Sequence, residues 1–475
     1  MSPPDRAGPP DRAGPPDRAG PPDRLGPPDR PKPLRPERAR LFLESLALDL
    51  LYLLATPILL AAFFVVSRAF TRPKLRRGLL AKLGLGLDRR DGSRPLLWIH
   101  AVSVGEVNTA APLVDALRRQ RPELELCVSV STFTGFEVAR KRFGSDIRVI
   151  YAPLDFSFVV RRFLHRLRPG AIVLIELELW PNLLLCARRK GVPVLVANGR
   201  LSERSERRYR WGRCLTRRLF NLPTAIGAQN EASSGRFLSV GVDPQRLRTL
   251  GNLKHDREPS PSAFRAPSIR EKLGWKRGEA LVLVGGSTHP GEELALCSTF
   301  SRLRPRAPGL RLVIVPRHIE RLGGDEATRW GAPEPIVRWS SIREDPSSAH
   351  VTGALVVDTL GELEMFYAVA DIVFVGGSLI PHGGQNLLEP ARLARPILFG
   401  PSYQNFQEEG DLLLAGAAAI RVADAKELET RLEALLTDPA ERERLSSNAL
   451  SVSRRLGGAV TKHVEWIELF FPKLA

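Results

Sequence analysis

The sequence predicts an α/β protein with two doubly wound domains, preceded by a helix that associates with a membrane. From residue 95 onward, short apolar runs alternate with helical patterns, which is typical of a parallel sheet covered by helices. The alternation restarts after a looser stretch at residues 254–267, so a second domain is expected there. Residues 46–66 form an apolar run about as long as the ~20 residues that cross a bilayer as a helix.

The first 40 residues are expected to be a disordered tail. Residues 3–30 repeat the motif PPDRAG almost without change, and a segment this rich in proline and charge cannot build a core. A recognition role for the repeat is the alternative to a merely solvated extension.

Residues 41–67 are predicted to be the membrane helix. Only Asp49 and Pro57 interrupt its apolar run, and the segment either crosses the bilayer once or lies in one leaflet. Basic residues follow without an acidic residue among them, which favours a cytoplasmic position for the following domains and contact with anionic lipids. These residues are Arg68, Arg72, Lys74, Arg76, Arg77 and Lys82.

The two domains are expected at residues 68–258 and 259–475. Strands of the first are predicted at 95–100, 124–131, 149–152, 171–175 and 192–197, with helices that include 109–120 and 158–167. Strands of the second are predicted at 280–284, 310–315, 354–358, 372–375 and 396–399. Ligands of such folds bind at the carboxyl ends of the strands, so a cleft between the domains is the expected site.

Charge and cysteine content narrow the function classes. The 475 residues carry a formal net charge of +18, which suits an anionic partner such as a phosphorylated substrate or an acidic membrane surface. Nucleic acid is not expected, because zinc-finger and RNP signatures are absent. Four scattered cysteines form no CxxC or Cys/His spacing, so neither a disulfide framework nor a metal centre is predicted, and no cofactor is expected.

Residues 376–390, GGSLIPHGGQNLLEP, resemble a phosphate and sugar pocket. A strand-like run ends at Gly376, and Gly383 and Gly384 open a segment with helical spacing whose N–H groups can attract a phosphate. Asn386 and Glu389 share one face of that helix and can bind a ribose diol. The alternative is a glycine-rich loop that caps a buried helix.

Three carboxylates follow predicted strands of the first domain. Glu106 lies in a strand-to-helix turn, where it either takes a proton from a hydroxyl or caps the helix. Glu176 and Glu178 end another strand, and burying either one is costly unless it is paired, which favours a functional role.

Polar groups also follow strands of the second domain. Ser287 and Thr288 offer hydroxyl and backbone donors to a phosphate, and Arg317 offers a planar guanidinium, with a surface arginine as the alternative. The turn at 358–363, DTLGEL, is expected to close the pocket around a base or ribose.

Eight motifs in this order resemble the 3-deoxy-D-manno-octulosonic acid (Kdo) transferases that act on lipid A. They are WIHAVSVGE, ELELWPN, NGRLSERS, GNLKHD, GGSTHPGEE, VPRH, DTLGEL and GGSLIPHGGQNLLEP. The resemblance covers about residues 40–470 and implies a GT-B architecture of two Rossmann-like domains facing a cleft. It also implies inverting, metal-independent transfer of Kdo from CMP-Kdo to the lipid A precursor, lipid IVA, at the inner membrane in lipopolysaccharide core biosynthesis.

The resemblance implies roles for individual residues. Glu106 is the expected general base, and Glu176, Glu178 and Arg200 are expected to bind the acceptor. The donor site is expected to comprise Ser287, Thr288, Pro316, Arg317, Gly361, Glu362, Leu363, Asn386 and Glu389. The chain departs from the commoner family pattern at Gln385 and Ser402.

Two other enzyme classes and one non-enzymatic role are the competing interpretations. A nucleotide-sugar epimerase or a UDP-sugar transferase would share the two-domain pattern, although the apolar segment argues against a soluble epimerase. A membrane scaffold without activity is contradicted by the presence of Glu106, Arg317 and Glu389 together.

Overall fold

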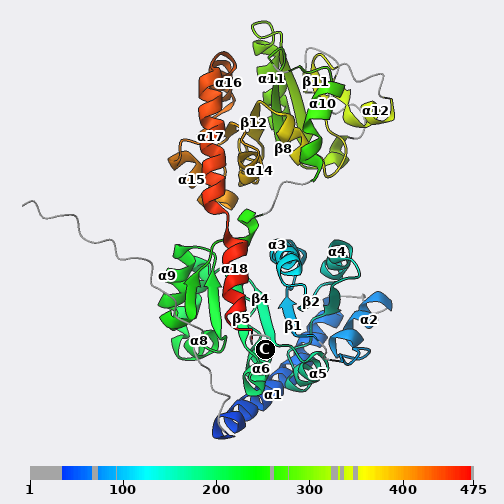
Figure 1. Cartoon of the computed structure of the whole chain (residues 1–475), viewed down its shortest axis with the longest axis vertical. Helices are drawn as coiled ribbons and strands as arrows, with labels where there is room; N and C mark the ends of the chain where they lie inside the picture. Colours follow the sequence, from blue (N-terminus) through cyan, green and yellow to red (C-terminus); the bar gives the residue numbers. More distant parts are fainter. Residues whose placement is uncertain are drawn as a thin grey trace, which may run out of the picture.

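The computed structural model describes residues 35–66, 73–91, 94–256, 261–276, 278–322, 330–331, 336–345 and 351–471. Side chains are not described at residues 35, 55–66, 73–77, 213–215 and 261–262. The PPDRAG repeat therefore lies outside the described residues, as do the side chains of most of the basic cluster predicted after the apolar segment. Within the described part, the chain forms two bodies, each built on one parallel sheet (Figure 1).

The first sheet has seven parallel strands in the order β3-β2-β1-β4-β5-β6-β7. Its strands are β1 (Leu96–His100), β2 (Glu125–Val130), β3 (Arg148–Tyr151), β4 (Ala171–Ile175), β5 (Val194–Gly199), β6 (Ala225–Ala228) and β7 (Leu247–Thr249). Its helices are α3 (Val104–Gln120), α4 (Phe133–Phe143), α5 (Ser157–Leu167), α6 (Pro181–Lys190), α7 (Glu203–Trp211), α8 (Arg213–Phe220) and α9 (Glu231–Ser239). The central strands are buried on both faces, which explains their continuous apolar runs.

The second sheet also has seven parallel strands, in the order β10-β11-β9-β8-β12-β13-β14. Its strands are β8 (Leu281–Thr288), β9 (Leu310–Pro316), β10 (Val337–Arg338), β11 (Ala354–Val356), β12 (Ile372–Val375), β13 (Ile397–Phe399) and β14 (Ala419–Arg421). Its helices are α10 (Ala266–Lys272), α11 (Glu292–Leu303), α12 (Trp339–Glu344), α13 (Leu363–Val369), α14 (Leu388–Arg392), α15 (Gln407–Ala415), α16 (Ala425–Thr437) and α17 (Pro439–Leu456).

The prediction of two doubly wound α/β units is confirmed. Every predicted strand has a counterpart within a few residues, whereas β6, β7, β10 and β14 were not predicted. These four strands are short, and β7, β10 and β14 lie at or next to the sheet edges, where pairing with a neighbour rather than a long apolar run defines the strand.

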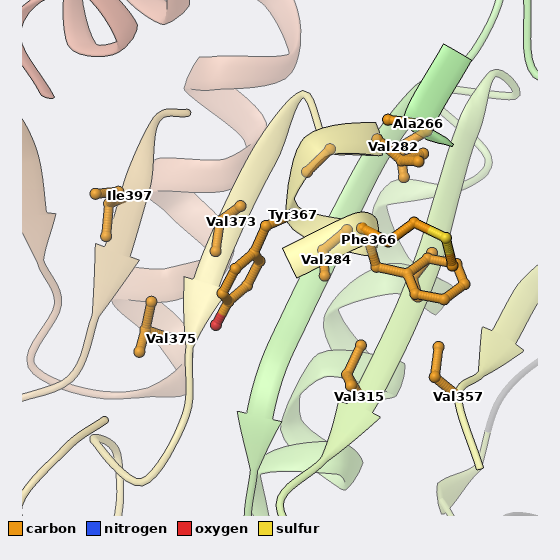
Figure 2. Packing of buried hydrophobic residues seen from close by; sticks show 14 of the residues in the cluster. Ala266, Val282, Val284, Val315, Val357, Phe366, Tyr367, Val373, Val375 and Ile397 are labelled. Atoms are coloured by element: carbon orange, nitrogen blue, oxygen red, sulfur yellow. The ribbon is translucent and has the colours of Figure 1, made fainter. Parts of the chain in front are cut away.

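The second core packs one helix against the valines of its central strands. Figure 2 shows Phe366 and Tyr367 of α13 over Val284, Val373 and Val375. A Cβ atom built on Gly286 would lie 2.2 Å from the Tyr367 hydroxyl oxygen. Gly286 is therefore required by this close packing.

The last helix, α18 (Ala459–Glu468), packs on the first body, although the sequence assigned residues 259–475 to the second. Figure 1 shows α18 running from the end of α17 to the first sheet. It packs against α3, the His463 ring accepts a hydrogen bond from the Asn198 N–H at 3.1 Å, and Arg121 pairs with Glu468 at 2.9 Å. Apolar Val464 and Ile467 enter the first core, which is the physical reason for this position.

Helix α1 (Arg35–Val66) covers the predicted membrane segment, and its first half packs on the first body. Asp49 is only 7% exposed and accepts hydrogen bonds from the Ser157 N–H at 2.7 Å and the Asn182 side chain at 3.0 Å. Across the described ranges of the chain, no helix combines the length and apolar character needed to span a bilayer. The single-pass alternative for residues 41–67 is therefore not supported by the described residues. The first half of α1 instead packs one of its faces against the first body.

Candidate active site

Both groups of predicted site residues lie where the strand order reverses. In the first sheet, β1 and β4 are neighbours. The strand that follows β1 in the chain, β2, lies on one side of this pair, and the strand that follows β4, β5, lies on the other. Glu106 follows β1, and Glu176 and Glu178 follow β4, so the carboxyl ends of these two strands bring the three side chains to one edge. In the second sheet the equivalent pair is β8 and β12. Crevices at such reversal points are the usual ligand sites of open α/β sheets.

Glu106 forms a capping box at the start of α3. Its carboxylate accepts hydrogen bonds from the Val102 N–H at 2.7 Å and the Ser103 hydroxyl at 3.1 Å, and Ser103 accepts one from the Glu106 N–H. The capping role that the sequence left open is therefore present. Burial raises the pKa of Glu106, and these hydrogen bonds oppose the increase.

Glu178 and Glu176 interact electrostatically with Glu106. Burial, followed by the negative charge of Glu106, raises the pKa of Glu178 to about 7. Glu176 has a positive φ of 61° and pairs with the Lys254 ammonium at 2.9 Å. The Lys254 carbonyl in turn accepts a hydrogen bond from Arg392 of α14 at 3.0 Å, so this lysine contacts both bodies.

Arg200 lies beside another contact between the bodies. Its side chain is exposed, and its positive charge is close enough to Glu409 of α15 to lower the pKa of that carboxylate. Burial by itself would raise the pKa of Glu409, but the hydrogen bond with His255 at 3.0 Å and the charge of Arg200 lower it. Arg200 is therefore near Glu409 of the second body but is not part of the Glu106 cluster by any described contact.

A residue that the sequence did not single out, Glu292, joins the two glycine loops of the second body. Its carboxylate is 1% exposed and accepts hydrogen bonds from the N–H groups of Gly377, Ser378 and Leu379 at 2.7–3.0 Å, and from the His289 N–H at 3.0 Å. The N–H groups at the first glycine pair are therefore occupied by this carboxylate and are not open to a phosphate. The signal for this role in the sequence is a glutamate in the first helical turn after a glycine-rich loop.

The helix predicted to begin at Gln385 begins at Leu388 and is only five residues long. The Gly384 N–H bonds the Gly377 carbonyl, and the Leu388 N–H bonds the Asn386 side chain. The helix therefore starts three residues later than predicted, and the N–H groups of Gly384 and Leu388 are already engaged within the protein. Asn386 and Glu389 are brought together as expected, with the Asn386 amide donating to the Glu389 carboxylate at 3.2 Å.

Three histidine rings gather near Gln385. The centroid of the His289 ring lies 4.0 Å from that of His382 and 5.8 Å from that of His318, and Gln385 Nε2 lies 3.2 Å from His289 Nε2. Burial, followed by the charges of His382 and His318, lowers the pKa of His289 to about 4. The sequence did not predict this cluster, because its members come from three separate loops.

The other predicted donor residues lie at or after the carboxyl ends of β8, β9 and β11. Ser287 and Thr288 end β8, the Thr288 carbonyl accepts a hydrogen bond from the N–H of the exposed Arg317, and Pro316 ends β9. In the 358–363 turn, Gly361 has a φ of 85°, Glu362 pairs with Arg343 at 3.2 Å, and Leu363 begins α13. Ser402, a departure from the family pattern, accepts a hydrogen bond from the Gly383 N–H at 2.9 Å.

Comparison with known proteins assigns the family. The model of the family "3-Deoxy-D-manno-octulosonic-acid transferase (kdotransferase)" matches residues 74–257. A 3-deoxy-D-manno-octulosonic acid transferase of Haemophilus influenzae is 31% identical over 89% of this chain and 98% of its own length. The chain belongs to the Kdo transferase family. The homologous enzyme of Bordetella pertussis is 31% identical over 78% of this chain and 86% of its own.

A solved structure supports the two-domain α/β fold of this Kdo transferase family member. UDP-GlcNAc 2-epimerase from Neisseria meningitidis superimposes with a TM-score of 0.53 at 14% identity, over 79% of this chain and 99% of that one. The C-terminal CMP-Kdo binding domain of WaaA from Acinetobacter baumannii is 29% identical over 40% of this chain and 97% of its own, with a TM-score of 0.37. The architecture is GT-B, and the protein is a glycosyltransferase.

Proposed function

We propose that this Kdo transferase moves Kdo from CMP-Kdo to the lipid A precursor lipid IVA in lipopolysaccharide core biosynthesis, with inversion at the anomeric centre. The observation that carries the proposal is the carboxylate cluster of Glu106, Glu176 and Glu178 at the reversal point of the first sheet. Such a cluster suits removal of a proton from a sugar hydroxyl.

Glu106 is the proposed general base. Its two hydrogen bonds hold the carboxylate in a defined position, and burial raises its pKa toward the range in which a base works well. The negative charges of Glu106 and Glu178 disfavour simultaneous ionisation of both groups. A proton held on Glu178 therefore keeps Glu106 ionised and ready to accept the hydroxyl proton.

The donor is proposed to bind at the β8 and β12 ends of the second body. Arg317 and the Ser287 hydroxyl are proposed to supply positive charge and a hydrogen-bond donor for the single phosphate of CMP, whereas the fully buried Thr288 side chain supports the end of β8. Gly361, Glu362, Leu363, Asn386 and Glu389 are proposed to surround the nucleoside. Because these groups can stabilise a departing CMP, we expect full activity in excess EDTA.

The acceptor is proposed to be reached from the surface of the inner membrane, on which α1 lies. The side of α1 that faces the protein carries Ser45 and Asp49, whereas leucines face outward. An exposed apolar helix face of this kind is stable when lipid covers it, and nearby cations favour anionic lipids. The exposed leucines are Leu43, Leu46, Leu50, Leu51, Leu53 and Leu54.

The direct test is to incubate the purified chain with CMP-Kdo and tetra-acylated lipid A precursor, and to measure the product by mass spectrometry. A mass gain of one or more Kdo residues with release of CMP is the expected result. UDP-sugars in place of CMP-Kdo should give no product. Absence of any mass gain with CMP-Kdo would remove the proposed reaction.

A further inference from the structure

A cavity of about 590 Å³ lies beside the edge strand of the first sheet and contains none of the residues assigned above. Its walls come from α2 (Pro73–Lys82), the loop at residues 85–87, α4, β3 and α5. Most of the lining is apolar or aromatic, including Leu85, Phe133, Phe136, Tyr151 and Phe163, and its charged members are Glu137 and Arg140. Its size falls within the ~300–1,000 Å³ of pockets that bury small ligands.

Part of the cavity lining lies at the same sheet edge as Glu106. Phe133 begins α4 directly after β2, and Tyr151 ends β3, so both lie at the carboxyl ends of parallel strands. The start of α4 also contacts the start of α3, because a Cβ atom built on Gly135 would lie 3.4 Å from the Val104 nitrogen. From Phe133 to Arg140 the cavity follows α4 for about 10 Å, at 1.5 Å per residue.

Two stacked rings form part of the cavity wall, and much of its exposed rim is apolar. Phe136 stacks on Tyr151 with ring centroids 4.2 Å apart, while Leu85 and Phe133 are each more than two-fifths exposed. Exposed Leu79 and Leu80 of α2 continue this apolar surface along the helix that follows α1. An elongated, apolar ligand that enters from a membrane surface fits this shape, and the exposed, oppositely charged side chains of Glu137 and Arg140 mark the polar end of the cavity along α4.

We propose that this cavity binds an acyl chain of the glycolipid acceptor and so positions the sugar hydroxyl at Glu106. The inference rests on the proposed function. It adds a subsite that selects acylated over deacylated acceptors, because burying the chain removes apolar surface from water.

The test fills the cavity without disturbing the fold. Gly78 is helical with no positive φ, and a Cβ atom there would meet the Tyr151 ring at 3.8 Å, an ordinary contact. In Gly78→Leu, kcat/KM for tetra-acylated precursor should fall about tenfold or more, while kcat/KM for the deacylated disaccharide should not change. Gly235→Leu, at a helical glycine with no atom within 4 Å, is the matched control and should leave both values unchanged.

A second measurement does not depend on turnover. A 12-carbon fatty acid with a diazirine group should label peptides at residues 78–87 and 133–151 of the wild type, and labelling should be lost in Gly78→Leu and on adding acylated precursor. If the wild type transfers nothing yet is labelled there, the proposed reaction fails and the acyl site stands. Equal loss of activity toward both acceptors, labelling confined to α1, or protection by phosphatidylglycerol vesicles but not by precursor would each overturn the proposal.

Discussion

At the scale of single residues, the helix cap observed at Glu106 is compatible with the proposed role of this residue as general base, although the sequence left the two as alternatives. Its carboxylate caps α3 through Val102 and Ser103, and the same hydrogen bonds hold it beside Glu178. A capping contact therefore does not argue against catalysis, because a general base must be held in place.

Replacing Glu106 by glutamine separates these roles. The side-chain carbonyl oxygen of the introduced glutamine can still accept the hydrogen bond from the Val102 N–H, and its NH2 group can donate to the Ser103 hydroxyl oxygen, but the side chain cannot accept a proton. We expect transfer in Glu106→Gln to fall by about 10²- to 10⁴-fold, with CMP binding and thermal stability retained. Ser103→Ala is the control, since it weakens the cap by about 1 kcal/mol and keeps the carboxylate. Wild-type turnover in Glu106→Gln would leave Glu106 with a capping role alone.

Glu178 should make stability depend on pH. Burial raises its pKa from the ordinary value of 4.5 to about 7, so the folded state binds a proton that the unfolded state releases. This contribution to the free energy of unfolding is complete below pH 4.5 and is lost as the pH rises through 7. In urea denaturation from about pH 4 to 8, the wild type should lose more stability than Glu178→Gln. The effect of Asp155, whose pKa is also raised to about 7, is common to both proteins and cancels. Parallel stability curves would contradict the raised pKa.

At the scale of elements, helix α1 turns polar residues toward the protein and leaves most of its leucines exposed, which is the reverse of an ordinary surface helix. Residues 41, 45 and 49 recur every four positions and face the protein, although two of them are polar. The hydrogen bonds of Asp49 to α5 and α6 therefore fix the helix, because the apolar side is left for another surface.

Asp49→Ala should detach the first half of α1. The Ser157 N–H would lose its buried acceptor and the Asn182 amide one of its two acceptors, so we expect the free energy of unfolding to fall by about 3 kcal/mol. Glu44→Ala on the same helix removes surface ion pairs with Arg40 and Arg218 and should cost less than about 1 kcal/mol. Urea denaturation of both variants measures the difference, and equal small losses would show that Asp49 does not hold the helix.

At the scale of the whole molecule, the two bodies are connected by more than the chain between the domains. Helix α18 returns to the first body, Asp256 accepts a hydrogen bond from the Val460 N–H, and Lys254 contacts both Glu176 and Arg392. Through Lys254, a carboxylate of the Glu106 cluster is therefore linked to α14 of the second body.

Binding of the whole protein to a membrane surface should depend on α1. Leu50→Gln with Leu54→Gln should weaken co-sedimentation with phosphatidylglycerol vesicles at least tenfold, because each leucine loses apolar burial in lipid. The paired control, Leu294→Gln with Leu469→Gln, changes leucines of similar exposure elsewhere and should have no effect. Wild-type binding should also weaken as salt rises, since cations contribute. Equal binding by both double variants would assign the membrane contact to another surface.

The sequence by itself determined the class of fold, the central strands and the family. Long apolar runs such as Ala171–Ile175 must be buried on both faces, and ordered motifs such as GGSTHPGEE are read directly from the chain. It also located Glu106, Glu178 and the Asn386–Glu389 pair, because each follows a strand or lies three residues from its partner.

Only the tertiary structure decided how those residues are used. It showed that the N–H groups after Gly376 are taken by Glu292, that α14 begins at Leu388, and that α18 belongs to the first core by its contacts. It also turned Asp49 from an interruption of an apolar run into the residue that fixes α1. These features depend on groups far apart in the chain, so no local pattern of propensity or spacing could specify them.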